Sequence, residues 1–337
     1  MAVDLDAAKT AFLTGRLDEA EALFRAGLSE RPASAASDLG SLYVHTGRMR
    51  EGVGLLLKAI ERSPGWALPR YNLALALLGL GHSELGWMLF EARRALPELK
   101  APSPDFPFPE WTGQPLAGRR LVVLGEQGAG DQIMFARYIP VLQQQGAEVI
   151  FVCDAALASL LPAAVAGIAR RTAADYWAPL LSLPYRLGPA LAAPPPPLLA
   201  VLSGGGGGIG VMAAGSPTHS NDLNRSLRGA DARRLLALGR SLAPEATGAG
   251  SFLDTARIIA GLDLVISVDT AIAHLAASLG KPTWILIPEL GVDWRWGRRS
   301  DRTAWYPSAR LYRQAQPGDW RSVLDAVEGD LGRLGLS

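Results

Sequence analysis

Apolar residues in the first 100 positions recur at the spacing of an α-helix. Residues three and four positions apart lie on one side of a helix, so such a stripe predicts one buried helix face. The stripe appears twice, one repeat unit apart, in the residues Leu23, Phe24, Leu28, Leu55, Leu56 and Ile60. This pattern predicts paired amphipathic helices, and the stripes read as ordinary core.

Glycines recur at regular intervals, at the expected turns between these helices. Gly15, Gly47 and Gly81 stand 32 and 34 residues apart, where a tight helix-to-helix turn needs an unhindered backbone. A small residue follows each glycine by five positions, which lets paired helices approach closely: Ala20, Gly52 and Gly86. The segment resembles tetratricopeptide repeats, whose unit is about 34 residues. We therefore predict a repeat domain over residues 1–100, which offers a concave binding face or serves only as a packing cap.

The pattern changes after residue 100. Residues 101–118 combine prolines with large aromatic residues, which predicts an ordered, packed linker. The short apolar run 121–124 then leads into a glycine-rich turn, an expected helix over 132–145 and a second apolar run over 148–152. Strand, turn, helix and strand form a βαβ unit. We predict a Rossmann-like, acceptor-side lobe over residues 119–203.

A second α/β pattern begins after residue 203. Prolines over 194–197 and glycines over 204–208 predict a hinge between lobes. The expected strands are 209–212, 262–267 and 283–287, and the expected helices are 231–241, 252–260 and 271–279. We predict a donor-side lobe over residues 204–337. The predicted fold is thus α-helical tetratricopeptide repeats followed by an α/β GT-B domain, whose two Rossmann-like lobes face a cleft.

Composition excludes several classes of function. The formal net charge is +1 and no run of five basic residues occurs, so a nucleic-acid partner is not expected. Cys153 is the single cysteine and there are only four histidines, which argues against a disulfide or a built-in metal site. The first residues do not form a signal peptide, and no apolar run is long enough to cross a membrane. We expect a cytoplasmic protein without a membrane span.

The first candidate site is the glycine-rich turn 125–132, which follows a strand and opens a helix. Its backbone N–H groups and the helix dipole favour an anion. Asp131 is the candidate general base, and its alternative role is to cap the helix. The residues expected to line the cleft beside Asp131 are Glu126, Gln127, Gly128 and Gly130. A dinucleotide site is the competing interpretation, but Ile133 stands where the stricter G-x-G-x-x-G pattern needs its third glycine.

The second candidate site lies in the second lobe, where a buried strand meets a helix. The N–H groups of Thr270 and Ala271 are placed to hold a diphosphate, Asp269 to receive sugar hydroxyls, and His274 to face the same side. The alternative is that Asp269 or Thr270 only caps the helix and His274 belongs to the core. Ser216 and Arg225, in the loop after the lobe's first strand, complete the expected donor site; a solvated loop arginine is the alternative for Arg225.

These motifs together resemble bacterial proteins that join tetratricopeptide repeats to a heptosyltransferase-like (glycosyltransferase family 9-like) domain. The resemblance covers almost the whole chain. The segments that carry it include 86–91, 109–114, 126–131, 180–184, 221–226, 269–276, 293–296 and 305–307. At residues 213–216 the chain has Ala-Ala-Gly-Ser, where such relatives usually have a Trp-Ser-Gly-Asn-like turn.

The resemblance implies a metal-independent GT-B glycosyltransferase that uses a nucleotide sugar as substrate and needs no cofactor. Asp131 would be its base, and Asp269, Thr270, Ala271 and His274 would contact the donor. Related proteins with such repeats include flagellin glycosyltransferases, so a protein acceptor held by the repeats is expected. Two other functions stay open: a non-catalytic repeat adapter with a degenerate transferase domain, and a dinucleotide-dependent oxidoreductase.

Overall fold

The computed structural model describes residues 4–169, 172–188, 194, 195, 197, 199 and 207–335. The chain forms two compact units. The first contains Met1–Leu99 together with Pro288–Arg299, and the second contains Lys100–Ile287 and Ser300–Ser337. Among the helices in the described ranges, none combines the length and apolar character that a bilayer-spanning segment requires.

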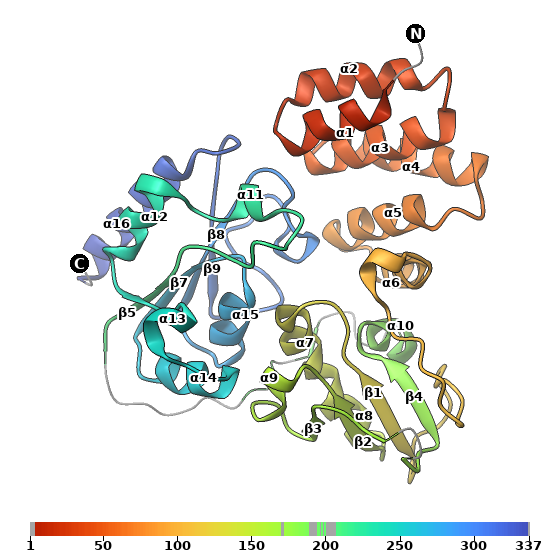
Figure 1. Cartoon of the computed structure of the whole chain (residues 1–337), viewed down its shortest axis with the longest axis vertical. Coiled ribbons are helices and arrows are strands. Elements are labelled where there is room, and N and C mark those ends of the chain that lie inside the picture. The colour runs from red at the N-terminus through yellow and green to blue at the C-terminus, as the bar shows by residue number, and fades with distance from the viewer. Residues whose placement is uncertain are drawn as a thin grey trace. The chain divides into compact units, whose positions relative to one another are not determined.

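The first unit is built from three helical hairpins followed by short 3₁₀ turns (Figure 1). Consecutive helices pair as α1 with α2, α3 with α4, and α5 with α6. Their bounds are α1 Leu5–Leu13, α2 Leu17–Gly27, α3 Pro32–His45, α4 Met49–Arg62, α5 Ala67–Gly79, α6 Ser83–Phe90, η1 Glu91–Ala95 and η2 Pro97–Leu99. This arrangement confirms the predicted helical repeats.

The repeat glycines occupy the positions that the sequence predicts. Gly15, Gly47 and Gly81 have φ values of 79°, 82° and 84°, which a residue with a side chain rarely adopts. Each lies in the turn within one hairpin. At Gly52 an added Cβ would lie 2.7 Å from the carbonyl oxygen of Gly40, so the paired helices need a glycine there. The apolar stripe is also core, since Phe24 and Leu56 are fully buried.

A segment from far along the chain belongs to the first unit. Pro288–Arg299 contains the 3₁₀ turn η6 (Trp294–Trp296) and packs against α5. The Trp294 ring meets the Trp87 ring edge to face, with centroids 5.3 Å apart. The predicted domain boundaries placed these residues in the second lobe, whereas in the structure they pack with the repeats.

The second unit begins with a parallel sheet in the order β3-β2-β1-β4. Leu121 pairs with Val149 on one side and with Tyr176 on the other. The linker packs along β4, where the Trp111 N–H donates to the Trp177 carbonyl oxygen at 2.7 Å. The elements are β1 Arg120–Leu124, α7 Ala129–Phe135, η3 Ala136–Tyr138, α8 Ile139–Gln144, β2 Glu148–Val152, α9 Ala155–Ala158, β3 Ala164–Val165, β4 Tyr176–Pro179, η4 Leu180–Ser182 and α10 Leu183–Leu187.

A second parallel sheet follows in the order β6-β5-β7-β8-β9. Strands β7 and β8 are buried along their whole length. The elements are β5 Ile209–Met212, α11 Asp222–Arg225, α12 Gly229–Leu236, β6 Arg240–Ser241, α13 Pro244–Thr247, α14 Phe252–Ala260, β7 Leu264–Val268, α15 Ala271–Ser278, β8 Thr283–Ile287, β9 Ala309–Arg313 and α16 Trp320–Leu334. Two parallel α/β sheets after helical hairpins confirm the predicted fold class, while the cleft between the lobes stays a prediction.

Two predicted helices have the wrong extent. The helix expected over 132–145 is interrupted by η3, because Pro140 has no N–H to donate to the carbonyl four residues earlier. The helix expected over 231–241 ends at Leu236, and β6 begins at Arg240. Between them, Gly239 approaches the Ile209 carbonyl so closely that a Cβ would lie 2.3 Å from its oxygen. Of the residues that predict the hinge, 194–197 and 204–208, positions 196 and 204–206 lie outside the described residues.

Candidate functional site

The turn between β1 and α7 holds Asp131 at the start of a helix. Gly128 is the N-cap of α7, and Asp131 is the third helical residue. The Asp131 carboxylate accepts a hydrogen bond from the Gly128 N–H at 3.2 Å, which satisfies one of the free donors at the helix start. Asp131 therefore does have a capping role, though not as the N-cap itself. Its role as general base stays a prediction.

The two residues before Gly128 shape this turn. Glu126 is buried, and its carboxylate accepts the N–H of Leu181 at 2.9 Å, which ties the turn to η4. Gln127 has a φ of 59°, which is uncommon for a residue with a side chain and marks a strained backbone. Its Nε2 has no hydrogen-bond partner within the described residues. Both residues thus fix the path of the loop, and their contact with a ligand stays a prediction.

The turn between β7 and α15 is capped by Thr270. Its backbone is extended, and its hydroxyl accepts the Ile272 N–H at 3.2 Å. The same hydroxyl lies 3.2 Å from the Ser267 Oγ, so two side chains define the helix start. The capping residue is thus Thr270 rather than Asp269. Capping does not remove the predicted donor role, because further N–H groups of the first turn lack partners inside the helix.

The structure brings these two turns together. Helices α7 and α15 pack against each other (Figure 1). The helices approach tightly at Gly130, where a Cβ would lie 2.8 Å from Cδ2 of His274 and 3.4 Å from the Cα of Ala271. Only a glycine leaves room for the imidazole here. Asp131 is next to Gly130 in the chain, and Thr270 is next to Ala271. The two predicted site residues therefore flank the contact between the helices.

Arg225 connects the loop after β5 to the second turn. Its Nη1 donates to the Asp269 carbonyl oxygen at 2.9 Å, and its side chain is only 11% exposed. Arg225 is therefore not a solvated loop residue. Its guanidinium packs on Gly215, where a Cβ would lie 2.5 Å from Nη2. The arginine thus supports the backbone of the predicted donor turn, and a phosphate contact stays a prediction.

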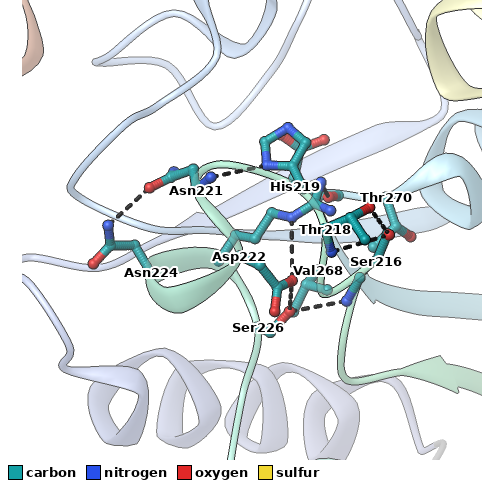
Figure 2. Close-up of polar contacts among 12 residues, drawn as sticks. Ser216, Thr218, His219, Asn221, Asp222, Asn224, Ser226, Val268 and Thr270 are labelled. Atoms are coloured by element: carbon teal, nitrogen blue, oxygen red, sulfur yellow. Dashed lines mark hydrogen bonds and ion pairs between the residues drawn. The ribbon is translucent and has the colours of Figure 1, made fainter. Parts of the chain in front are cut away.

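Hydrogen bonds hold the loop before Arg225 in a compact form (Figure 2). The Ser226 hydroxyl donates to Asp222 at 2.6 Å and accepts the N–H of Gly215 at 2.9 Å. Ser216, predicted to contact the donor, is exposed and forms a 2.8 Å hydrogen bond with the Thr218 hydroxyl. Its predicted ligand contact is not tested by this geometry.

Sequence reasoning did not assign Tyr306, which contacts His274, or Arg137, which contacts Tyr306, to the site. The Tyr306 hydroxyl is 2.9 Å from Nδ1 of His274, and both residues are buried. Arg137 donates from Nη1 to the Trp305 carbonyl oxygen at 2.9 Å and lies over the Tyr306 ring. Burial lowers the pKa of Arg137. Arg137 follows α7, so it links the two lobes next to the candidate site.

His274 combines features of both sequence interpretations. It is a buried histidine with a hydrogen-bond partner, as a core residue would be. Its Nε2 also lies 3.8 Å from the Asp269 carboxylate, which places the two predicted donor residues next to each other. Within the described residues, histidine, cysteine and acidic side chains do not gather in any group of three or more that could bind a metal ion. The metal-independent reaction stays a prediction.

Comparison with known proteins supports the predicted domain type. Residues 227–286 match glycosyltransferase family 9 (heptosyltransferase). This range begins after the Arg225 loop and runs through the β7–α15 turn to β8. The prediction of a heptosyltransferase-like domain is confirmed for this part of the second lobe.

Two individual proteins are also similar to parts of the chain. Protein FlbA of Caulobacter vibrioides is 39% identical over 87 residues, which cover 25% of this chain and 15% of FlbA. A mutant (K341M) of the Thermobaculum terrenum O-GlcNAc transferase aligns with a TM-score of 0.31 and 13% identity, covering 93% of this chain and 57% of that chain. The chain therefore spans a small part of FlbA and just over half of the transferase.

Proposed function

We propose that this chain transfers a sugar from a nucleotide-sugar donor to a hydroxyl group. The observation that carries the proposal is the contact of Gly130 with Ala271 and His274. It sets the start of α7, with its carboxylate, against the start of α15, with its N–H groups. A transferase needs both a base for the acceptor and a binding site for the diphosphate. The family 9 match over 227–286 supports the assignment of the diphosphate-binding site to α15.

In the proposed reaction, Asp131 acts on the acceptor. Its carboxylate takes the proton of the acceptor hydroxyl while that oxygen bonds to the anomeric carbon of the donor. The bond between this carbon and the diphosphate breaks, and the diphosphate leaves with the electron pair. Free N–H groups at the start of α15 stabilise its negative charge, aided by Arg225. The reaction needs no resident metal ion or cofactor.

We further infer that the helical unit binds the acceptor, which is then a protein. Repeat arrays present extended surfaces that recognise polypeptide segments. The three hairpins have tight glycine turns and a buried core, so they offer such a surface as a preformed element.

A ligand panel in a thermal-shift assay tests the proposal. The full chain is heated with UDP-, GDP-, CMP- and ADP-sugars and, separately, with NAD⁺ and NADP⁺. A ligand at about 100 times its dissociation constant adds ~2.7 kcal/mol to the free energy of unfolding. We expect one class of nucleotide sugar to raise the melting temperature. A shift with the dinucleotides alone would instead indicate an oxidoreductase, and no shift with any ligand would indicate an adapter.

A further inference from the structure

The two ring nitrogens of His274 face different chemical groups. Nδ1 lies 2.9 Å from the Tyr306 hydroxyl, and Nε2 lies 3.8 Å from Oδ1 of Asp269. Its carbon edge packs against Gly130 at the start of α7. The ring therefore lies between a phenol, a carboxylate and the backbone of the other lobe. Which nitrogen carries the proton decides what the ring offers to a ligand there.

Tyr306 is itself fixed in place. The residue is fully buried, and the guanidinium carbon of Arg137 lies 5.0 Å from the centre of its ring. Arg137 is also tied to the neighbouring residue, since its Nη1 donates to the Trp305 carbonyl oxygen. The phenol thus has little freedom to move away from His274, and its hydroxyl is held at hydrogen-bond distance from Nδ1.

The chemistry of the two partners selects one tautomer. A neutral imidazole has one N–H and one bare nitrogen, whereas an ionised carboxylate only accepts hydrogen bonds. A proton on Nε2 suits the nearby Asp269 carboxylate, and it leaves Nδ1 to accept from the Tyr306 hydroxyl. We propose that Tyr306 is a positioning residue that keeps the His274 proton on Nε2, so that this N–H can donate to an oxygen of the sugar donor. The identity of that ligand rests on the proposed function.

The tautomer can be measured without any ligand. ¹⁵N NMR of the full chain distinguishes a protonated from a bare imidazole nitrogen, and an H274N variant identifies the His274 signals among the four histidines. In the wild type we expect a bare Nδ1 and a protonated Nε2. In Y306F, which keeps the ring and removes only the hydroxyl, we expect a shift toward a mixture of tautomers. A protonated Nδ1 in the wild type, or an unchanged spectrum in Y306F, would overturn the proposal.

Y312F is a matched control for the loss of a buried phenol. Tyr312 is buried in the same lobe, and its hydroxyl donates to Asp330 at 2.7 Å rather than to a histidine. Its removal should leave the His274 signals unchanged. If Y312F altered them as Y306F does, the effect would be a general loss of packing and the positioning role would be wrong.

Calorimetry then tests what the tautomer does for binding. With a nucleotide sugar that binds the wild type, Y306F should bind more weakly by the factor by which the Nε2–H tautomer is depleted, about twofold for an equal mixture. Unchanged affinity in a variant whose tautomer has shifted would refute a role in donor binding. If the wild type binds no nucleotide sugar, the proposed function fails, whereas the NMR result still decides the tautomer.

Discussion

At the scale of single residues, the candidate site depends on the carboxylate of Asp131 and on the lack of a side chain at Gly130. Asp131 contributes a carboxylate that already accepts one backbone hydrogen bond from Gly128. Its neighbour Gly130 has no side chain, and the space beside it is filled by the imidazole of His274. Each feature predicts the result of a conservative substitution.

Asp131→Asn removes the charge and keeps the size and the hydrogen-bond acceptor. Because the amide cannot act as a base, we expect turnover to fall by about 10²–10⁴-fold while donor affinity stays nearly constant. Steady-state kinetics and calorimetry measure the two quantities. Asp154→Asn is the control: this exposed aspartate lies just after β2, and its loss should not affect transfer. Wild-type turnover in Asp131→Asn would exclude it as the base.

Gly130→Ala should disturb the contact between α7 and α15. The new Cβ would lie 2.8 Å from His274, so the helices must separate, at a cost of roughly 1–3 kcal/mol typical of overpacking. Gly128→Ala in the same turn is the control, because its Cβ would lie at an ordinary 3.5 Å from Asp131. Chemical denaturation compares their stabilities. Equal stability of the two variants would mean that the contact is not tight.

Sequence reasoning proposed candidate site residues that belong to local motifs, but it did not find the neighbouring residues that depend on long-range contacts. Asp131 and Thr270 each follow a strand and start a helix, so their surroundings can be predicted from nearby residues. Tyr306 and Arg137 come from segments far apart in the chain. The available signal was an arginine within the apolar run 133–139 and the Trp-Tyr-Pro sequence at 305–307, and neither identifies a partner.

At the scale of elements, helix α4 shows how close packing limits the sequence. Gly52 faces α3, where a Cβ would lie 2.7 Å from the Gly40 oxygen and 2.8 Å from Cγ2 of Val44. Gly54, in the same helix, has open space around it. Close packing therefore requires a glycine at position 52 but leaves room for a larger residue at position 54.

Alanine substitution should change stability in opposite directions at these two sites. We expect Gly52→Ala to destabilise the protein by about 1–3 kcal/mol, because α3 and α4 must move apart. Gly54→Ala should stabilise it by up to about 1 kcal/mol, because alanine restricts the unfolded chain and favours a helix. Urea unfolding of the full chain measures both. A stabilising Gly52→Ala would show that the helix pair is not closely packed.

Strands were predicted where an apolar run is continuous, as in β1, β2, β5 and β8. Four strands were missed, β3, β4, β6 and β9, and the two longest, β4 and β9, show the physical reasons. Tyr176–Pro179 is short and ends in a proline, which is a weak strand signal. Ala309–Arg313 carries two arginines and forms the edge of its sheet, where only part of the strand is buried. Their pairing depends on neighbouring strands rather than on their own composition.

At the scale of the whole molecule, the first unit is not contiguous in sequence. Pro288–Arg299, which directly follows β8, supplies part of its packing. Trp294 contacts Trp87 of α6. It also lies against α5, where a Cβ added at Gly79 would be 3.7 Å from the Trp294 Cβ. No local pattern reveals this, because the contacting helices and the segment are separated by about two hundred residues.

Trp294→Ala should loosen the last hairpin of the repeat unit. Trp294 is half-buried, so we expect a loss below the about 3–5 kcal/mol typical of a fully buried tryptophan. Hydrogen exchange on the full chain should show faster exchange in α5 and α6. Leu85→Ala is the control, since Leu85 on α6 is 46% exposed and its removal should have little effect. Unchanged exchange in Trp294→Ala would mean that the segment adds nothing to the stability of the hairpin.

The central claim, that the start of α15 holds a nucleotide sugar beside Asp131, is tested most directly at Thr270. Isothermal titration compares the wild type, Thr270→Ala and Thr270→Ser with a nucleotide sugar that raises the melting temperature. Serine keeps the capping hydroxyl, so we expect affinity close to that of the wild type. Alanine should weaken binding by about 10–100-fold, because it removes the Thr270 hydroxyl, which in this proposal also donates a hydrogen bond to the charged diphosphate. Equal affinity of all three proteins would place the donor elsewhere and contradict the account.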